Sequence, residues 1–145
     1  MPTSSAYIVM PHHVNGTHRL FGGQLMAWID VAAAVEARRH SRRGVTTAAV
    51  DHLTFLSPAY LDETVRLHAR VTRAWRTSLE VRVESYAEPV EGEPRLINAA
   101  YLVFVALDAD GSPARVPEFT PGTAAEREEW ENAGRRREAR LAAKR

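Results

Sequence analysis

Residues 20–35 read LFGGQLMAWIDVAAAV, and Asp30 is the only charged residue among them. The two glycines end an irregular stretch, and from Gln24 onward the segment consists mainly of strong helix formers. Basic residues at 38–40 follow near the expected end of the segment, where cations complement the helix dipole. The pattern predicts one long helix over Gly22–His40.

The apolar residues of this segment surround the helix axis and do not form a single stripe. Such a helix is buried on most sides, so we expect a sheet to wrap around it. A chain of 145 residues can form one domain with a substantial core. One small sheet nevertheless gives such a helix little cover, and oligomerisation is therefore expected.

Asp30 is the first catalytic candidate, because a carboxylate is costly to remove from water without compensation. Two helical turns separate Gly23 from Asp30, which places the first-turn amides and the carboxylate on one face, about 10 Å apart. The Gly23 N–H would then stabilise a developing oxyanion while Asp30 acts as a general base. The alternative is a structural acid paired with an arginine or a backbone amide.

The rest of the chain reads mainly as strands. The run at 96–107 is apolar on both faces, which indicates a central strand or an interface. The runs at 64–73 and 78–87 alternate, and their charged residues are expected to face solvent. Strands grouped after one helix indicate an α+β fold, a curved antiparallel sheet around one long helix. The expected strands are 6–10, 45–55, 64–73, 78–87 and 96–107.

The C-terminal segment, 118–145, reads as a charged helical tail. Thr123 and Glu126 form a capping box, with acidic residues early and arginines late in the helix. Its apolar stripe is weak and Gly134 interrupts it, so we expect a solvated, partly frayed helix. A tail for RNA or a membrane surface is the alternative.

Composition argues against several classes of protein. The formal net charge of +1 gives no general attraction for nucleic acid, and without cysteine there is no disulfide or cysteine-based zinc site. We find no export leader and no membrane span, and therefore expect a cytoplasmic protein that binds neither nucleic acid nor membrane.

With the order of elements established, the sequence resembles the hotdog-fold acyl-CoA thioesterases of the bacterial single-domain kind, related to cytosolic acyl-CoA hydrolases. The resemblance covers Tyr7 to Pro117, which implies a hotdog domain over 1–117. The matching residues are Pro11, Asn15, Phe21-Gly22-Gly23, Met26, Asp30, Thr47, Val50–Phe55, Pro58, Arg76–Val81, Val103–Asp108, Gly111 and Val116-Pro117.

The resemblance implies hydrolysis of an acyl-CoA to free acid and CoA, without metal or cofactor. Asp30 would activate water or attack directly, Asn15 would hold the water or the carbonyl from the opposite protomer, and the Gly23 amide would polarise the thioester. The substrate or its CoA arm would meet Gly22, Thr47, Arg76, Thr77 and Ser78. The resemblance also implies a homodimer with one continuous sheet, which in many members assembles into a hexamer, a trimer of dimers.

This chain departs from the family pattern at four positions, which indicates an altered substrate range. His13 stands where the family usually has an acidic residue, two before the asparagine. His18, Asp62 and Trp75 stand where it usually has glycine. We expect Trp75 to narrow the pantetheine channel or to stack on adenine.

Two further candidates are interpreted as structural. Three histidines, His12, His13 and His18, have no carboxylate at ligand spacing, so an exposed histidine loop is favoured over a metal site. Asp51 is favoured as a strand residue bonded near the site over a second catalytic carboxylate.

Two other functions compete with the thioesterase. A hotdog hydratase or dehydratase would need a histidine in the central helix segment, which has none over 22–35. A non-catalytic acyl-CoA-binding hotdog protein would need the altered loop to have lost its geometry.

Overall fold

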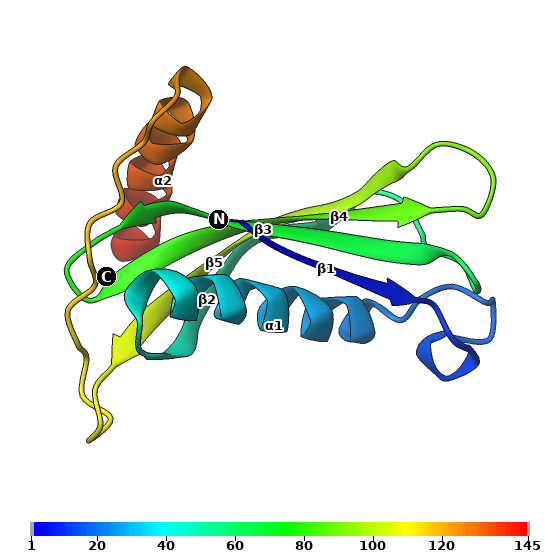
Figure 1. The fold of residues 1–145 in the computed structure, drawn as a ribbon, viewed down its shortest axis with the longest axis horizontal. Helices are drawn as coiled ribbons and strands as arrows, with labels where there is room; N and C mark the ends of the chain where they lie inside the picture. The colour runs from blue at the N-terminus through cyan, green and yellow to red at the C-terminus, as the bar shows by residue number, and fades with distance from the viewer. Residues whose placement is uncertain (1, 145) are drawn as a thin grey trace.

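The computed structural model describes residues 2–144 and contains one sheet with a long helix on each side of it (Figure 1). The elements are β1 (Thr3–Ile8), a 3-10 turn (Pro11–His13), α1 (Gly22–Ser41), β2 (Gly44–Phe55), β3 (Thr64–Ala74), β4 (Ser78–Glu88), β5 (Arg95–Leu107) and α2 (Ala124–Ala143). The α+β prediction and the helix at Gly22–His40 are confirmed.

The five strands are paired antiparallel throughout, in the order β1-β3-β4-β5-β2. The strand expected at 96–107 corresponds to β5, which lies between β4 and β2 and is internal, as its apolar faces predicted. β1 and β2 form the two edges. In Figure 1, α1 runs along one face of the sheet, and α2 stands on the other face near one end.

The first strand was expected at 6–10, and this prediction is wrong in its bounds. β1 pairs with β3 from Thr3 onward, and the buried Thr3 hydroxyl donates to Glu36 of α1 at 2.8 Å. Val9 has already left the strand, because its N–H bonds the carbonyl of Glu63. Pairing with β3 and the buried contact of Thr3 therefore decide the bounds of this strand. The apolar run at 6–10 does not.

The core fills the space between α1 and the sheet. Ile29 is fully buried on α1, and Trp28 stacks on Tyr7 of β1 with ring centroids 4.4 Å apart. The opposite side of α1 is open in the single chain, where Met26 and Val31 keep 45% and 57% of their surface. The expectation of a helix buried on most sides therefore fails for one chain, because the sheet covers only one side of it.

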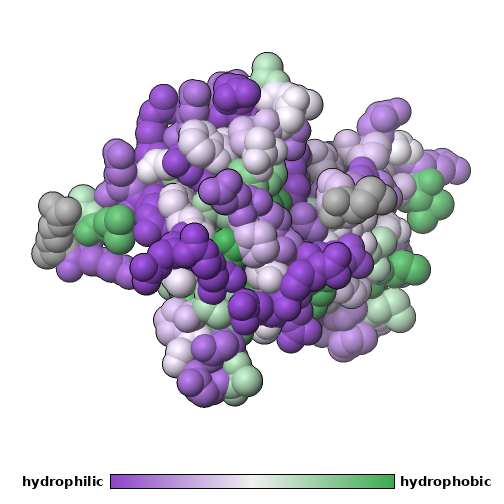
Figure 2. All heavy atoms as spheres, turned by 60° about the vertical axis from the view of Figure 1, so that its left-hand side comes forward, coloured by the Kyte–Doolittle hydropathy of each residue, from purple (hydrophilic) through white to green (hydrophobic). Residues whose placement is uncertain are grey.

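The C-terminal helix is docked on the sheet, which corrects the expectation of a solvated, frayed tail. It begins where predicted, since the Thr123 side chain accepts from the Glu126 N–H at 3.1 Å, and it continues through Gly134. Ala133 is fully buried. In the part of the chain that the structure describes, no helix is long and apolar enough to cross a membrane. Figure 2, with the α2 end forward, shows a mostly hydrophilic surface.

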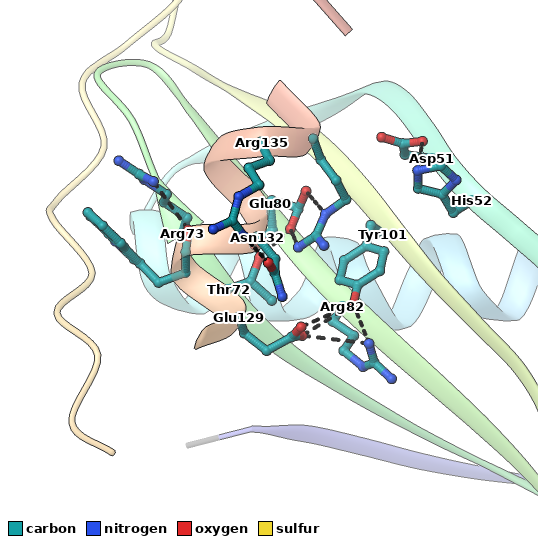
Figure 3. Close-up of polar contacts among 12 residues, drawn as sticks. Asp51, His52, Thr72, Arg73, Glu80, Arg82, Tyr101, Glu129, Asn132 and Arg135 are labelled. Carbon is teal, nitrogen blue, oxygen red and sulfur yellow. Dashed lines mark hydrogen bonds and ion pairs between the residues drawn. The ribbon is translucent and has the colours of Figure 1, made fainter. Parts of the chain in front are cut away.

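Docking of α2 buries a carboxylate of β4 that was expected to face solvent. Glu80 is fully buried, and Arg136 of α2 donates to both of its oxygens, at 2.8 and 3.0 Å. The Thr72 hydroxyl donates to Glu80 at 2.6 Å from beneath, as Figure 3 shows. Burial alone would lower the pKa of the Arg136 guanidinium, but the hydrogen bonds to Glu80 help to raise it. This ion pair joins the tail to the sheet.

Two of the family glycines that this chain replaces fall where the backbone is left-handed. His18 has a φ of 60° and Asp62 a φ of 71°. L-residues pay about 1–2 kcal/mol in this region, although aspartate and histidine tolerate it better than most. Non-glycine residues at these two positions therefore carry a cost in stability.

We expect Asp62→Gly to stabilise the protein by about 1 kcal/mol, because glycine adopts a positive φ without a steric penalty. For a chain of this length the corresponding rise in melting temperature is roughly 2–4 °C. Asp62→Ala is the matched control, since it also removes the carboxylate but retains a Cβ. An alanine variant as stable as the glycine variant would show that backbone strain is not the cause.

We expect Arg136→Met to destabilise the protein by about 2–4 kcal/mol, because it leaves the buried Glu80 without its bidentate partner. Urea unfolding measures the change. The control is Arg135→Met on the exposed side of the same helix, where a change within about 0.5 kcal/mol is expected. Equal losses for the two variants would contradict a special role for the buried pair.

Candidate active site

The carboxylate of Asp30 lies in a groove between α1 and β2. Thr47 of β2 donates its hydroxyl to Asp30 Oδ1 at 2.7 Å, which fixes the carboxylate and leaves Oδ2 free to accept a proton. The alternative expectation for Asp30 was a structural acid paired with an arginine or a backbone amide. The observed partner is a hydroxyl. Asp30 is half-buried, and so remains accessible to a ligand.

We call this cavity the Asp30 groove. Its volume is about 320 Å³ and its walls are mainly apolar. Gly23 lines it at the start of α1, where the first-turn N–H groups have no partner within the helix. A Cβ at Gly23 would have nothing within 4 Å, so this part of the groove is open. The lining residues are Gly23, Met26, Ala27, Ile29, Asp30, Thr47, Val50, Leu53 and Leu102.

The side chain of Asn15 is held by its own loop. Its Oδ1 accepts from the Thr17 N–H at 2.9 Å, the Thr17 hydroxyl at 2.7 Å and the Arg19 N–H at 3.2 Å. Among residues 2–144, no hydrogen-bond acceptor is found for its Nδ2. The loop therefore presents Asn15 as a hydrogen-bond donor.

Asn15 lines a second cavity, the Asn15 groove, of about 380 Å³. Gly22 also lines it, and a Cβ there would approach the Phe55 ring at 3.3 Å. The two grooves share no lining residue. Within one chain, the structure thus brings Gly23, Asp30 and Thr47 together and places Asn15 and Gly22 in a separate cavity.

The loop histidines are not all exposed, which corrects that expectation. His13 is partly buried against Trp28, with ring centroids 4.9 Å apart, and its Nδ1 accepts from the Met10 N–H at 2.9 Å. Burial lowers the pKa of the His13 imidazole, and the neighbouring His12 lowers it further. The neutral form of the His13 imidazole is therefore favoured. Within residues 2–144 no group of three or more potential metal-binding side chains is found.

Three of the five residues expected to meet the substrate or its CoA arm lie at the turn between β3 and β4. Arg76 is exposed, Thr77 is half-buried, and the Ser78 hydroxyl accepts from Arg137 of α2 at 3.3 Å. Trp75 precedes them and faces the Arg137 guanidinium, 4.7 Å from its ring centroid. In this structure Trp75 thus packs against α2.

Asp51 points toward α2 and is not in the Asp30 groove. It accepts from Arg140 Nη1 at 3.0 Å, and the same nitrogen lies 3.4 Å from Glu80 Oε2, so the two carboxylates share the α2 face of the sheet. Sequence reasoning missed these α2 arginines as partners of the sheet, and it did not predict the bond from Thr47 to Asp30. The signal that could have identified these arginines as partners of the sheet is their spacing along the last helix.

Known proteins are similar to this chain in sequence and in fold. The family model described as "Thioesterase superfamily" matches residues 18–92. The chain belongs to this family. An uncharacterised acyl-CoA thioester hydrolase of Bacillus subtilis is 40% identical over 116 residues, which cover 79% of this chain and 67% of that protein.

Solved structures of the superfamily confirm the hotdog fold. An acyl-CoA hydrolase from Staphylococcus aureus, in complex with butyryl-CoA and CoA, has a TM-score of 0.91 and 35% identity, covering 99% of this chain and 88% of its own. A hexameric acyl-CoA thioesterase has a TM-score of 0.94 and 34% identity, covering 98% and 92%.

The Staphylococcus aureus hydrolase has been solved as three single-alanine variants, at an asparagine, an aspartate and a threonine. In that chain the aspartate follows the asparagine by 15 residues, and the threonine follows the aspartate by 17. The same spacings separate Asn15, Asp30 and Thr47 here.

Proposed function

We propose that this protein hydrolyses acyl-CoA thioesters to the free acid and CoA. The observation that carries the proposal is Asp30, bonded by Thr47 inside an apolar groove that Gly23, in the first turn of α1, also lines. Its superfamily relatives are acyl-CoA hydrolases, and one has been solved with an acyl-CoA and CoA bound.

The groups of the groove match the steps of thioester hydrolysis. Attack on the carbonyl carbon makes an oxyanion, which the Gly23 N–H at the helix start would stabilise. Asp30 Oδ2 would take the proton of an attacking water, or would attack the carbonyl itself. The tetrahedral intermediate then collapses and the C–S bond breaks. In the water route, the proton held by Asp30 passes to the departing thiolate, and CoA leaves as the thiol. In the direct route, water then hydrolyses the acyl–Asp30 anhydride and supplies the proton of the thiol. Every group used belongs to the chain, so the proposed reaction needs no metal and no added cofactor.

The Asn15 donor would come from a second copy of the chain. Supporting this, the edge strand β2 exposes apolar side chains, with Val50 and Phe55 keeping 46% and 50% of their surface. An edge strand of this kind is a template for strand pairing. The open side of α1 lies beside it and includes Met26 and Val31. A homodimer that pairs these surfaces would cover both, and a hexamer would be a trimer of such dimers.

The competing functions find less support in the site. A hydratase would use a histidine as its base, and neither of the two grooves has a histidine among its lining residues. A non-catalytic binding protein would have no need of a carboxylate with one oxygen bonded and the other free. The loop also keeps Asn15 oriented despite His13 and His18.

We expect Asp30→Asn to lower turnover of the best acyl-CoA by at least about a hundredfold, because the amide keeps the shape and the Thr47 contact but loses the base. Thiol release over a panel of acyl-CoAs measures it, with and without EDTA, which should have no effect. Asp110→Asn on the exposed β5–α2 turn is the control. Near wild-type turnover of the Asp30 variant would remove Asp30 from the mechanism.

The shared site is tested by mixing two inactive variants, Asn15→Ala and Asp30→Asn. After dissociation and reassociation, half of the dimers are mixed, and each mixed dimer has one wholly wild-type site if the residues come from different protomers. Activity should recover to roughly a quarter of wild type for independent sites. Proven subunit exchange without recovery would place both residues in one protomer and overturn the shared site.

A further inference from the structure

The last turns of α2 bring more positive charge to the sheet than the sheet neutralises. Arg136 and Arg140 bond the carboxylates of Glu80 and Asp51. Arg137 lies between them in sequence, and within residues 2–144 it has no carboxylate partner; its recorded hydrogen bond goes to the Ser78 hydroxyl. Lys144 adds another cation at the helix end.

Three of these cations, Arg137, Arg140 and Lys144, line one cavity, the α2 basic groove, of about 190 Å³. It lies between α2 and the outer face of β2, β4 and β5, and is lined by Ser78, Arg137, Arg140 and Lys144 together with small apolar strand residues. A guanidinium, an ammonium and a hydroxyl around a small cavity are the donors that a phosphate group accepts.

A ladder of alternating rings and guanidinium groups fixes the position of Arg137. The Arg73 guanidinium lies 3.5 Å from the Trp130 ring centroid and 5.8 Å from that of Trp75, and Arg137 lies 4.7 Å from Trp75. Gly134 makes room for the Arg73 guanidinium, because a Cβ at position 134 would lie 2.5 Å from Arg73 Nη1. Trp75 and Gly134 therefore act together to place Arg137 beside Ser78.

The surroundings of Arg137 favour an anion. Burial lowers the pKa of its guanidinium, and the positive charges of Arg140 and Arg73 lower it further. Arginine nevertheless remains protonated at neutral pH. The repulsion among these cations is relieved when an anion enters the groove.

Register places the groove near the Asp30 groove. Ser78 pairs with Val105 on β5, and the adjacent Phe104 pairs with Thr47, the partner of Asp30. Ser78 and Thr47 are therefore two strands apart, about 10 Å along the sheet, although on opposite faces of it. In acyl-CoA the extended pantetheine arm separates the thioester from a diphosphate and a 3′-phosphate.

We propose that the α2 basic groove is a phosphate site for an adenosine nucleotide, with Arg137 as its main ligand. This rests on the proposed function in one respect, since acyl-CoA itself would be the source of the nucleotide. A separate nucleotide that binds on its own would use the same chemistry. The experiments below distinguish the two sources.

The direct test is calorimetric titration with adenosine 3′,5′-bisphosphate, which needs no catalytic activity. We expect Arg137→Gln to weaken binding about tenfold, because a charge-assisted contact to phosphate is lost. Arg135→Gln, two residues before Arg137 and outside the groove lining, should bind like wild type. Trp75→Gly should also weaken binding, since it removes the ladder and no charge. Equal affinity for all four proteins, or an adventitious ion only, overturns the phosphate site.

The source of the nucleotide is tested by comparing acyl-CoA with the matching S-acyl-pantetheine, which lacks phosphate. If CoA supplies the nucleotide, Arg137→Gln raises KM for acyl-CoA about tenfold, leaves kcat within about twofold, and leaves the pantetheine substrate unchanged. Weakened bisphosphate binding with unchanged KM assigns the groove to a separate nucleotide. Equal loss on both substrates would show a structural role and overturn the proposal. A wild-type protein that hydrolyses neither substrate refutes the proposed function, while the titration still tests the groove.

Discussion

The structure depends on a helix that is apolar on all sides beside a sheet that covers only one of them. Ile29 and Ala33 are fully buried against the sheet, while Met26 and Val31 remain open. A soluble chain rarely leaves such a surface uncovered, because each exposed apolar side chain forgoes about 1.5–3 kcal/mol of burial. The same open side contains the Asp30 groove. The side of α1 that needs a partner surface is therefore also the side that contains the proposed catalytic carboxylate.

The second helix solves a different problem. A buried carboxylate must be paired and hydrogen-bonded, and beneath α2 Arg136 and Thr72 supply these contacts to Glu80. The pair also defines where along the sheet the helix docks. That docking position is what brings Arg137 to Ser78.

Much of the fold could be read from local patterns, and the failures have physical causes. The long helix and the internal strands follow from apolar periodicity, which the sheet enforces. β1 was misplaced because its polar residues Thr3 and Ser4 gain their partners from β3 and α1, which are distant in sequence. The alternation of β4 predicts that Glu80 faces solvent, because the residues of β4 themselves give no signal of the helix that covers them. In the site, Asp30 stood out by its isolation, whereas the bond from Thr47 spans 17 residues and depends on tertiary packing.

The loop around Asn15 fixes more than the position of one side chain. An asparagine amide can normally present either its oxygen or its nitrogen, but here the oxygen is saturated by three donors of its own loop. Rotation of the amide would forfeit all three bonds, so the exchange is strongly disfavoured. A group that binds the Asn15 Nδ2 must therefore offer a lone pair. A group that can only donate hydrogen bonds does not fit at this position.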